Sequence, residues 1–374
     1  MTVSEAKTKI WIAGPWPSVL PTFKVGENDL KCVSKHKYVG ITLSSTDRSI
    51  FKEHCYVKAS KARKSVNALF GAENFVGNVP PKDGIAIYMA TVDLHPMSAC
   101  DISIDIDATL LTQLERIQKL FIRRLLGVAN RSPVALLFSE TGMWPVKYRR
   151  IILALRYWQY ALSSRRSLFV HRYGRVSHPR PCQEIILDLR PRPCPASPAS
   201  LRINGLSRQW LPSDIDNLIT AVEQSGLVDI DSFIAASSKA LLLRYRSLHR
   251  TDPSSARETP VVSFHSYLNV PIPAHRKALV RLLTSSHTLA VEVLRRAERR
   301  HPPVPRSQHL CRFCLSEVED ETHALWYCDG SQSLDDLRAD FFKSVFLIAT
   351  SHFADLLTSA ASGFEVIHVL LGAI

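Results

Sequence analysis

The hydrophobic positions of the chain follow two different periods. Near the N-terminus, "KTKIWIAG" (residues 7–14) and "LKCVSKHKYVGITL" (residues 30–43) alternate apolar and polar residues around glycines, which is typical of short strands in a β-ribbon. Further along, the apolar spacing becomes helical. In "LLTQLERIQKLFIRRLLG" (residues 110–127), Gly127 stands where a helix C-cap is expected, and one apolar stripe is formed by Leu110, Leu114, Ile117, Phe121 and Leu125. The chain is therefore predicted to be mainly α-helical.

Both long helices predicted in the first half carry cations opposite their apolar side. The first places Arg116, Lys119 and Arg123 opposite its stripe. In the second, "KYRRIILALRYWQYAL" (residues 147–162), the apolar side is formed by Ile151, Leu155, Trp158 and Leu162, and the opposite side by Arg149, Arg156 and Tyr160. Residues 141–183 contain nine Lys and Arg and no acidic residue. The pattern favours binding along a nucleic-acid backbone over a merely solvated surface.

Two stretches rich in Pro and Ser, residues 178–200 and 251–275, are predicted to be linkers or long surface loops. They separate helical segments. The predicted organisation is a β-ribbon over residues 1–45, a helical bundle over 46–175, a linker with a short helical piece over 176–273, and a small helical C-terminal domain over 274–374.

The charge of the chain points to a polyanionic partner. Its 47 Lys and Arg exceed its 34 Asp and Glu by 13, which favours nucleic acid or an anionic surface. No basic segment followed by an apolar one opens the chain, and no apolar window is long enough for a membrane span. We therefore expect an intracellular, soluble protein without a membrane partner, whose eight cysteines are thiols or metal ligands.

The candidate chemistry lies in "LCRFCLSEVEDETHALWYC" (residues 310–328). Cys-x2-Cys followed by His-x4-Cys supplies Cys311, Cys314, His323 and Cys328, the ligand set of a closed tetrahedral Zn²⁺ site. Such a Cys3His site holds structure and leaves no open position for water. The alternative is three buried cysteines beside an incidental histidine. The acidic loop between the ligands, residues 317–321, would repel phosphate.

Two weaker patterns accompany the zinc motif. The segment before it, "EVLRRAERRHPPVPR", predicts a helix with Arg295, Arg296, Arg299 and Arg300 on one face, which is either a phosphate-binding or a solvated face; Arg295 and Arg299 are the candidate contacts. The alternating "DISIDID" (residues 101–107) is interpreted as a solvated edge strand rather than a Mg²⁺ site, and Mg²⁺ is not expected in this chain.

Several stretches, in this order, resemble the region downstream of the catalytic motif in non-LTR retrotransposon reverse transcriptases. "KTKIWIAG" and "KYVGITL" resemble the palm edge and its primer-grip turn, with Tyr38 and Gly40 in the turn. "IYMATVDLHPMSACDI", "LLTQLERIQKLFIRRLLG" and "ETGMWPVKYRRIILALRYW" look like the helical thumb, and residues 281–328 resemble the zinc-binding tail. The resemblance covers most of residues 5–165 and 274–345.

The resemblance implies a thumb that tracks an RNA or RNA/DNA duplex, a tail that engages RNA or DNA, and nuclear rather than cytoplasmic residence. Arg149, Arg150 and Arg156 are expected to contribute to duplex binding. The chain departs from the family because no adjacent aspartates precede "KYVGI". Its one Asp-Asp pair, Asp335 and Asp336, is interpreted as N-terminal charge of a helix.

We therefore expect a catalytically incomplete, reverse-transcriptase-derived protein that binds RNA or RNA/DNA duplex nonspecifically and is not an enzyme on its own. One alternative is a fragment of an active RNA-directed DNA polymerase whose catalytic part lies upstream. The other is a protein-interaction scaffold stapled by zinc.

Overall fold

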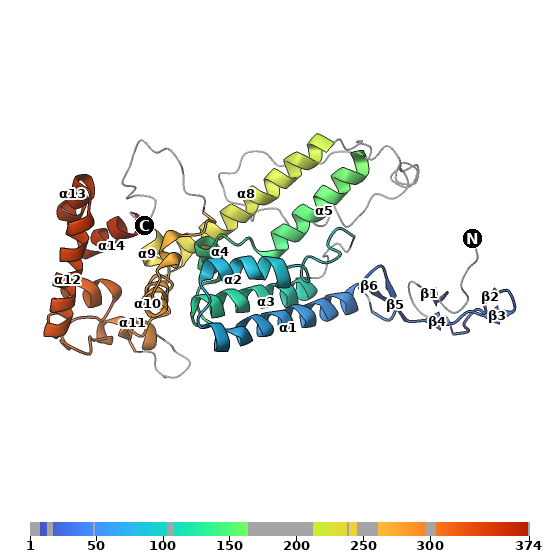
Figure 1. Cartoon of the computed structure of the whole chain (residues 1–374), viewed down its shortest axis with the longest axis horizontal. Coiled ribbons are helices and arrows are strands. Elements are labelled where there is room, and N and C mark those ends of the chain that lie inside the picture. The colour runs from blue at the N-terminus through green and yellow to red at the C-terminus, as the bar shows by residue number, and fades with distance from the viewer. Residues whose placement is uncertain are drawn as a thin grey trace. The chain divides into compact units, whose positions relative to one another are not determined.

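The computed structural model describes residues 8–12, 18–47, 49–102, 108–163, 212–237, 239–244, 261–295 and 304–372. Most of the described elements are helices, as the sequence predicts (Figure 1). The chain divides into two compact units that each combine three segments: Met1–Gly77, Ile85–Lys119 and Trp144–Gly226 in the first, and Asn78–Gly84, Leu120–Met143 and Leu227–Ile374 in the second. The domain boundaries predicted after residues 45, 175 and 273 stay predictions.

Short strands occupy both stretches of the first unit for which the sequence predicts them. β1 (Ile10–Trp11) pairs in parallel with β4 (Cys32–Val33), and β2 (Lys24–Val25) pairs antiparallel with β3 (Asn28–Asp29). β5 (Lys35–Tyr38) and β6 (Ile41–Ser44) form a hairpin in which Tyr38 faces Ile41. Its two turn residues have φ values of 45° and 85°, the left-handed pair that a tight hairpin requires.

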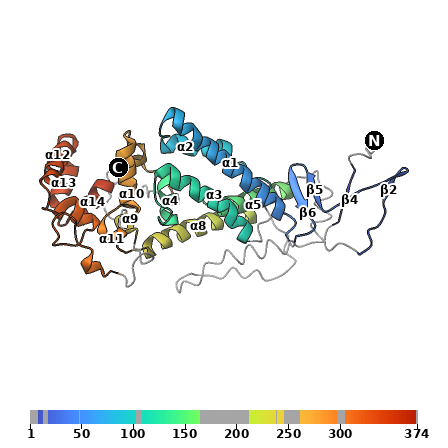
Figure 2. The same cartoon turned by 90° about the horizontal axis from the view of Figure 1, so that it is seen from below.

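Helix α1 (Lys52–Val76) covers this hairpin and the π-helical turn η2 (Tyr88–Val92) that follows α2 (Pro81–Ile87). Figure 2 shows β5 and β6 beside the N-terminal end of α1. His54 of α1 is buried and joins three parts of the unit. Its Nδ1 accepts a hydrogen bond from the Thr42 backbone N–H at 3.3 Å, and its Nε2 lies 3.4 Å from the Ser98 carbonyl.

Helix α3 (Ala108–Leu126) buries the whole apolar stripe that the sequence predicts, and Gly127 ends it at φ 69°. Gln118 then fixes the start of α5 (Val146–Ser163), because it donates to the Trp144 carbonyl at 2.9 Å and accepts from the Val146 N–H at 3.0 Å. Helix α8 (Pro212–Ala236) is the helical piece predicted between the linkers, and it is 25 residues long. Gln159 of α5 donates to Asp216 of α8 at 2.7 Å.

The second unit contains α4 (Val134–Thr141), α9 (Leu241–Arg244), η4 (Ser266–Asn269), α10 (Pro273–Leu283) and α11 (Ala290–Val293). The end of α4 is held by an isolated bridge between Thr141 and Phe264. The buried Glu140 accepts a hydrogen bond from the Tyr267 hydroxyl at 2.6 Å. A glycine is required after α4, since Gly142 has φ 70° and an added Cβ would lie 2.8 Å from the Phe264 nitrogen.

The same unit ends in η6 (Arg306–Gln308), η7 (His323–Tyr327), α12 (Gln332–Ile348), α13 (Ser351–Ser359) and α14 (Gly363–Gly372). Asp335 lies in the first turn of α12, as predicted for the Asp-Asp pair. Among the described residues, no helix combines the length and the apolar character that crossing a membrane requires. Most of "DISIDID", and the two predicted linkers except residues 261–275, lie outside the described residues.

Candidate metal centre

The first half of the Cys3His motif forms a tight turn between two short extended segments. Leu310 and Val318 form an isolated antiparallel bridge that closes the turn. Within it, the Cys311 N–H donates to the Glu317 carbonyl at 2.8 Å, and the Leu315 N–H donates to the Cys311 carbonyl at 2.9 Å. These bonds place both cysteines of Cys-x2-Cys on the inside of one knuckle.

The second half of the motif is held by a short helical segment that ends in η7. Asp320 begins it, because its Oδ1 accepts from the His323 N–H at 3.0 Å and from the Thr322 hydroxyl at 2.8 Å, as a helix-capping aspartate does. The Cys328 N–H donates to the His323 carbonyl at 2.9 Å. His323 and Cys328 therefore stand at opposite ends of one π-helical turn and face the knuckle.

The four predicted ligands converge. Their ligand atoms all lie within 4.8 Å of one another. The sulfurs of Cys311 and Cys328 are 3.5 Å apart, and Cys314 Sγ is 3.4 Å from His323 Nε2. A tetrahedron with metal–sulfur bonds of about 2.3 Å has edges of about 3.8 Å, so the donor spacing fits a single metal ion. Cys311, Cys328 and His323 are buried, so the site is largely closed to solvent.

Two residues that the sequence analysis did not single out support the site, Gly330 where the chain passes the knuckle and Arg338 behind the second half of the motif. A Cβ at Gly330 would lie 2.5 Å from the Cys314 nitrogen, so only glycine lets this backbone approach the knuckle. Arg338 of α12 donates to the carbonyls of Leu325 and Cys328 at 2.7 and 2.6 Å. The sequence shows the Arg and the Gly, but gives no signal of the carbonyls that they meet.

The thiols at the site have unlike electrostatic surroundings. Hydrogen bonding from the Ser316 side chain, and then from the Ser316 and Glu317 backbone, lowers the pKa of Cys314 to about 6. Burial raises the pKa of Cys328. Because metal ligation requires thiolates, binding of a cation should release protons from the site, that of Cys328 among them.

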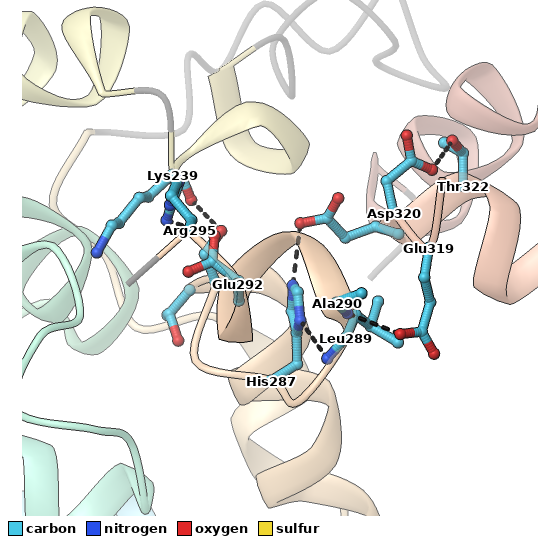
Figure 3. A network of polar contacts seen from close by, with 12 residues as sticks. Lys239, His287, Leu289, Ala290, Glu292, Arg295, Glu319, Asp320 and Thr322 are labelled. Atoms are coloured by element: carbon cyan, nitrogen blue, oxygen red, sulfur yellow. Dashed lines mark hydrogen bonds and ion pairs between the residues drawn. The ribbon is translucent and has the colours of Figure 1, made fainter. Parts of the chain in front are cut away.

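The acidic loop of the motif is mostly engaged in internal contacts (Figure 3). Glu319 is buried; it accepts from the Ala290 N–H at the start of α11 at 2.7 Å and from Arg312 at 2.6 Å. Glu321 accepts from His287 Nε2 at 3.0 Å. These contacts fasten α11 and the segment before it to the knuckle. The loop therefore acts as a set of structural ties, whereas the sequence analysis interpreted it only as a field that repels phosphate.

The expected cationic face of α5 is not formed as a whole. Arg149 makes a two-pronged ion pair with Asp93, with both N–O distances at 2.6 Å. Arg150 is buried and donates to the Pro96 carbonyl. The helical spacing predicts Arg149 on the outer side, but Asp93 at the end of η2 pairs with it, and the turn after η2 covers Arg150, the neighbouring expected contact. Only Arg156 of the three is exposed.

Some of the other predicted nucleic-acid contacts are exposed, and others are paired or partly buried. Arg116 is exposed, Lys119 is paired with Glu115 at 2.7 Å, and Arg123 is half-buried and donates to the Ser132 carbonyl. Tyr38 and Gly40 are exposed in the β5–β6 turn. Arg295 pairs with Glu292, and the described part of its predicted helix ends at Val293. Arg299 lies outside the described residues.

Another group of basic residues lies in the first half of α1 and in β5. Lys61, Arg63 and Lys64 of α1 are exposed, and half-buried Lys58 lies in the same stretch. The pKa of Lys58 is lowered by burial and then by the positive charges of Lys61 and Lys37, which brings exposed Lys37 of β5 into the group. We call these five residues the basic cluster. The run "KASKARK" (residues 58–64) is the signal in the sequence from which it follows.

Comparison of the chain with protein-family models, curated proteins and solved structures finds no match.

Proposed function

We propose that Cys311, Cys314, His323 and Cys328 bind one Zn²⁺ ion that stabilises the C-terminal part of the chain. The convergence of three thiols and one imidazole within 4.8 Å carries this proposal. Zinc is the ion that most often takes this donor set in a tetrahedron. All four positions are filled by protein groups, so the ion has a structural role and activates no water.

The test is the metal content of the purified full-length chain. We expect about one zinc per chain. A Cys314→Ser variant should lose most of it, whereas Cys32→Ser, which changes a thiol in β4 far along the chain, should keep it. Chelation should speed hydrogen exchange of residues 304–348. Substoichiometric zinc in the native chain, or full zinc in Cys314→Ser, would refute the site.

A second candidate function is nonspecific binding of RNA or RNA/DNA duplex, as the resemblance to reverse transcriptases implies. The basic cluster supports it, because α1 has no acidic residue between Glu53 and Glu73 to neutralise the cations. Neighbouring ammonium groups that already lower the pKa of Lys58 favour a polyanion, which relieves their repulsion. The cluster takes over the role that the sequence analysis gave to Arg149 and Arg150.

This binding is tested with a hybrid duplex of about two helical turns over a salt series. Replacing Lys61, Arg63 and Lys64 together with Glu should weaken affinity and lower the salt slope by about 0.9 for each phosphate that the variant no longer neutralises. An unchanged slope would remove the basic cluster from the interface.

The matched control replaces Lys24, Lys31 and Lys343 with Glu. These residues are exposed and lie outside the cluster, and the substitutions change the net charge by the same amount. The control should bind nearly as the native chain does. Equal weakening in both variants would mean that total charge, not the cluster, governs affinity.

Polymerase activity is not proposed, because the catalytic aspartate pair of reverse transcriptases is lacking before "KYVGI". Whether an upstream catalytic part accompanies the chain stays a prediction of the alternative interpretation, and an in-frame Asp-Asp hairpin in the preceding genomic sequence would favour it.

A further inference from the structure

One side of α1 brings two lysines and a serine next to a histidine from another segment. Lys58, Lys61 and Ser65 follow one another at spacings of three and four residues, so they share this side of the helix. Ser65 Oγ lies 3.4 Å from Nε2 of His95, which belongs to the turn after η2. The other ring nitrogen, Nδ1, is buried and has no hydrogen-bond partner among the described residues. The histidine therefore faces the lysine side of α1 through Nε2. We call these four residues the His95 site.

The other charged groups around His95 do not offset the lysines. His54 of α1 and the arginines Arg149 and Arg150 of α5 contact the turn after η2 or the residue that begins it. Asp93, the carboxylate two residues before His95, is held by Arg149 in the two-pronged ion pair. The surroundings of His95 are therefore positive.

The two lysines of the site have no acidic partner. Among the described residues, no ion pair involves Lys58 or Lys61. The two acids that precede them most closely are already paired: Glu53 with Lys35, and Asp47 with Lys52. Burial lowers the pKa of His95, and the positive charges of Lys58 and Lys61 lower it further. The site thus combines uncompensated positive charge with a group that can accept one more proton.

We propose that Lys58, Lys61 and Ser65 bind one phosphate group of a nucleic-acid backbone, and that His95 takes up a proton as the phosphate binds. This inference rests on the proposed binding of RNA or RNA/DNA duplex and adds to it a phosphate site and a dependence on pH. In the neutral ring, Nε2 accepts a hydrogen bond from the Ser65 hydroxyl. In the protonated ring, Nε2 donates to Ser65 Oγ, and the hydroxyl hydrogen becomes available to a phosphate oxygen.

Phosphate binding and protonation favour each other. A phosphate that neutralises Lys58 and Lys61 removes their repulsion against a proton on His95, so it raises the pKa of His95 in the complex. By linkage, the chain with protonated His95 binds phosphate more tightly. Between the lower pKa of the free chain and the higher pKa of the complex, affinity should increase as the pH falls. One proton accounts for at most about tenfold per pH unit.

The test is the affinity of the full chain for the hybrid duplex from about pH 6 to about pH 8 at constant ionic strength. Backbone phosphates do not titrate in this range, so the pH dependence comes from the protein. His95→Gln, which can still hydrogen-bond to Ser65, should bind as the native chain does near pH 8 and gain less affinity as the pH falls. His275→Gln, in an exposed residue of α10, is the control and should keep the native profile. Identical profiles of the native chain and His95→Gln would overturn the proposal.

Calorimetry measures the proton directly. Duplex is titrated near pH 6.5 in two buffers of unlike ionisation enthalpy, and the native chain should take up more protons than His95→Gln. A purely structural role of His95 would change affinity at every pH and leave the proton uptake unaltered.

Lysine variants locate the phosphate. Lys58→Gln with Lys61→Gln should weaken duplex binding severalfold and remove the part of the pH profile that depends on His95. Lys61→Gln alone changes an exposed residue and should show the same effects at smaller size. The control is Lys24→Gln with Lys31→Gln, two exposed lysines outside the site. Equal effects of the control and the site variants would overturn the proposed location.

Inorganic sulfate separates this site from the proposed function. Histidine ring signals are followed by nuclear magnetic resonance across the same pH range, in sulfate and in chloride of equal ionic strength. The signal of His95 is the one that His95→Gln lacks. Sulfate should raise the pH midpoint of this signal in the native chain, and less in the double lysine variant. A raised midpoint in a chain that binds no duplex would refute nucleic acid as the ligand, whereas the anion site would stand. Duplex binding with an unmoved midpoint would refute the His95 site alone.

Discussion

The ion pair between Arg149 and Asp93 tests whether Arg149 supports the fold or contacts nucleic acid. Two hydrogen bonds of 2.6 Å join the guanidinium of α5 to the carboxylate that ends η2. The side chain of Asp93 is 7% exposed and that of Arg149 is 22% exposed. Replacing Arg149 with Ala would leave a buried carboxylate without its partner.

The size of the loss follows from this geometry. Two unit charges 4 Å apart attract by about 4 kcal/mol at an effective dielectric constant of about 20. Removing one partner of a buried pair costs about 3–5 kcal/mol, because the other charge stays buried. Water reaches this pair from the side of Arg149, so the lower end applies. We expect Arg149→Ala to lower the unfolding free energy of the first unit by about 3 kcal/mol.

The measurement is urea unfolding of the full chain, monitored by hydrogen exchange. Peptides from η2 and α5 report the unfolding of the first unit separately from that of the second. Arg156→Ala is the control, since Arg156 is an exposed residue of the same helix and should cost less than about 0.5 kcal/mol. Equal stabilities of the two variants would refute the structural role of Arg149. Duplex affinity should be unchanged in Arg149→Ala as long as the protein is folded.

Three further perturbations have defined outcomes. Phe121→Ala in the buried stripe of α3 should cost about 3–5 kcal/mol in urea unfolding. Gly142→Ala should destabilise the chain by more than about 1 kcal/mol, because φ is 70° and the new Cβ meets the Phe264 nitrogen, whereas Gly71→Ala in open space within α1 should stabilise it by about 0.5–1 kcal/mol. Burial lowers the pKa of His54 in the folded chain. As the pH falls below about 6.5, His54 is therefore protonated in the unfolded chain before it is in the folded chain. The free energy of unfolding should be highest above about pH 6.5 and decrease below it. His54→Gln should flatten this fall in urea midpoints measured across that range, and a fall as steep as in the native chain would exclude His54 as its cause.

The sequence pattern predicted correctly those features of the fold that depend on one helix alone. The stripe of α3 and its terminal Gly127 are confirmed because a 3.6 period and a left-handed C-cap are properties of one helix. The outward position predicted for Arg149 was wrong, because Arg149 pairs with Asp93 at the end of η2, and the expected contact Arg150 is buried beside it. Nothing in the sequence of α5 encodes which segment packs against it, and the charge of an arginine does not distinguish a buried tie from a surface contact.

The metal centre divides in the same way. The convergence of the four candidate ligands was predictable, because Cys-x2-Cys and His-x4-Cys are short spacings that one knuckle and one helical turn satisfy. Arg338 and Gly330 were not, since their roles depend on carbonyls and a backbone that come close only after folding. The acidic residues of the loop 317–321 could be either solvated surface charges or partners in internal contacts. Only the contacts with His287 and Arg312, which form on folding, distinguish the two roles.

Charge is unevenly distributed along the chain. The residues outside 304–372 carry a net charge of +19, and residues 304–372 carry −6. If residues 304–372 lay beside a nucleic acid bound at α1, their negative charge would repel the nearby phosphates. The salt dependence of affinity that the basic cluster produces would then be smaller. Removing residues 304–374 should therefore leave duplex affinity unchanged or raise it. A loss of affinity on truncation, with the first unit still folded, would instead support the role in nucleic-acid binding that the resemblance assigns to the zinc-binding tail.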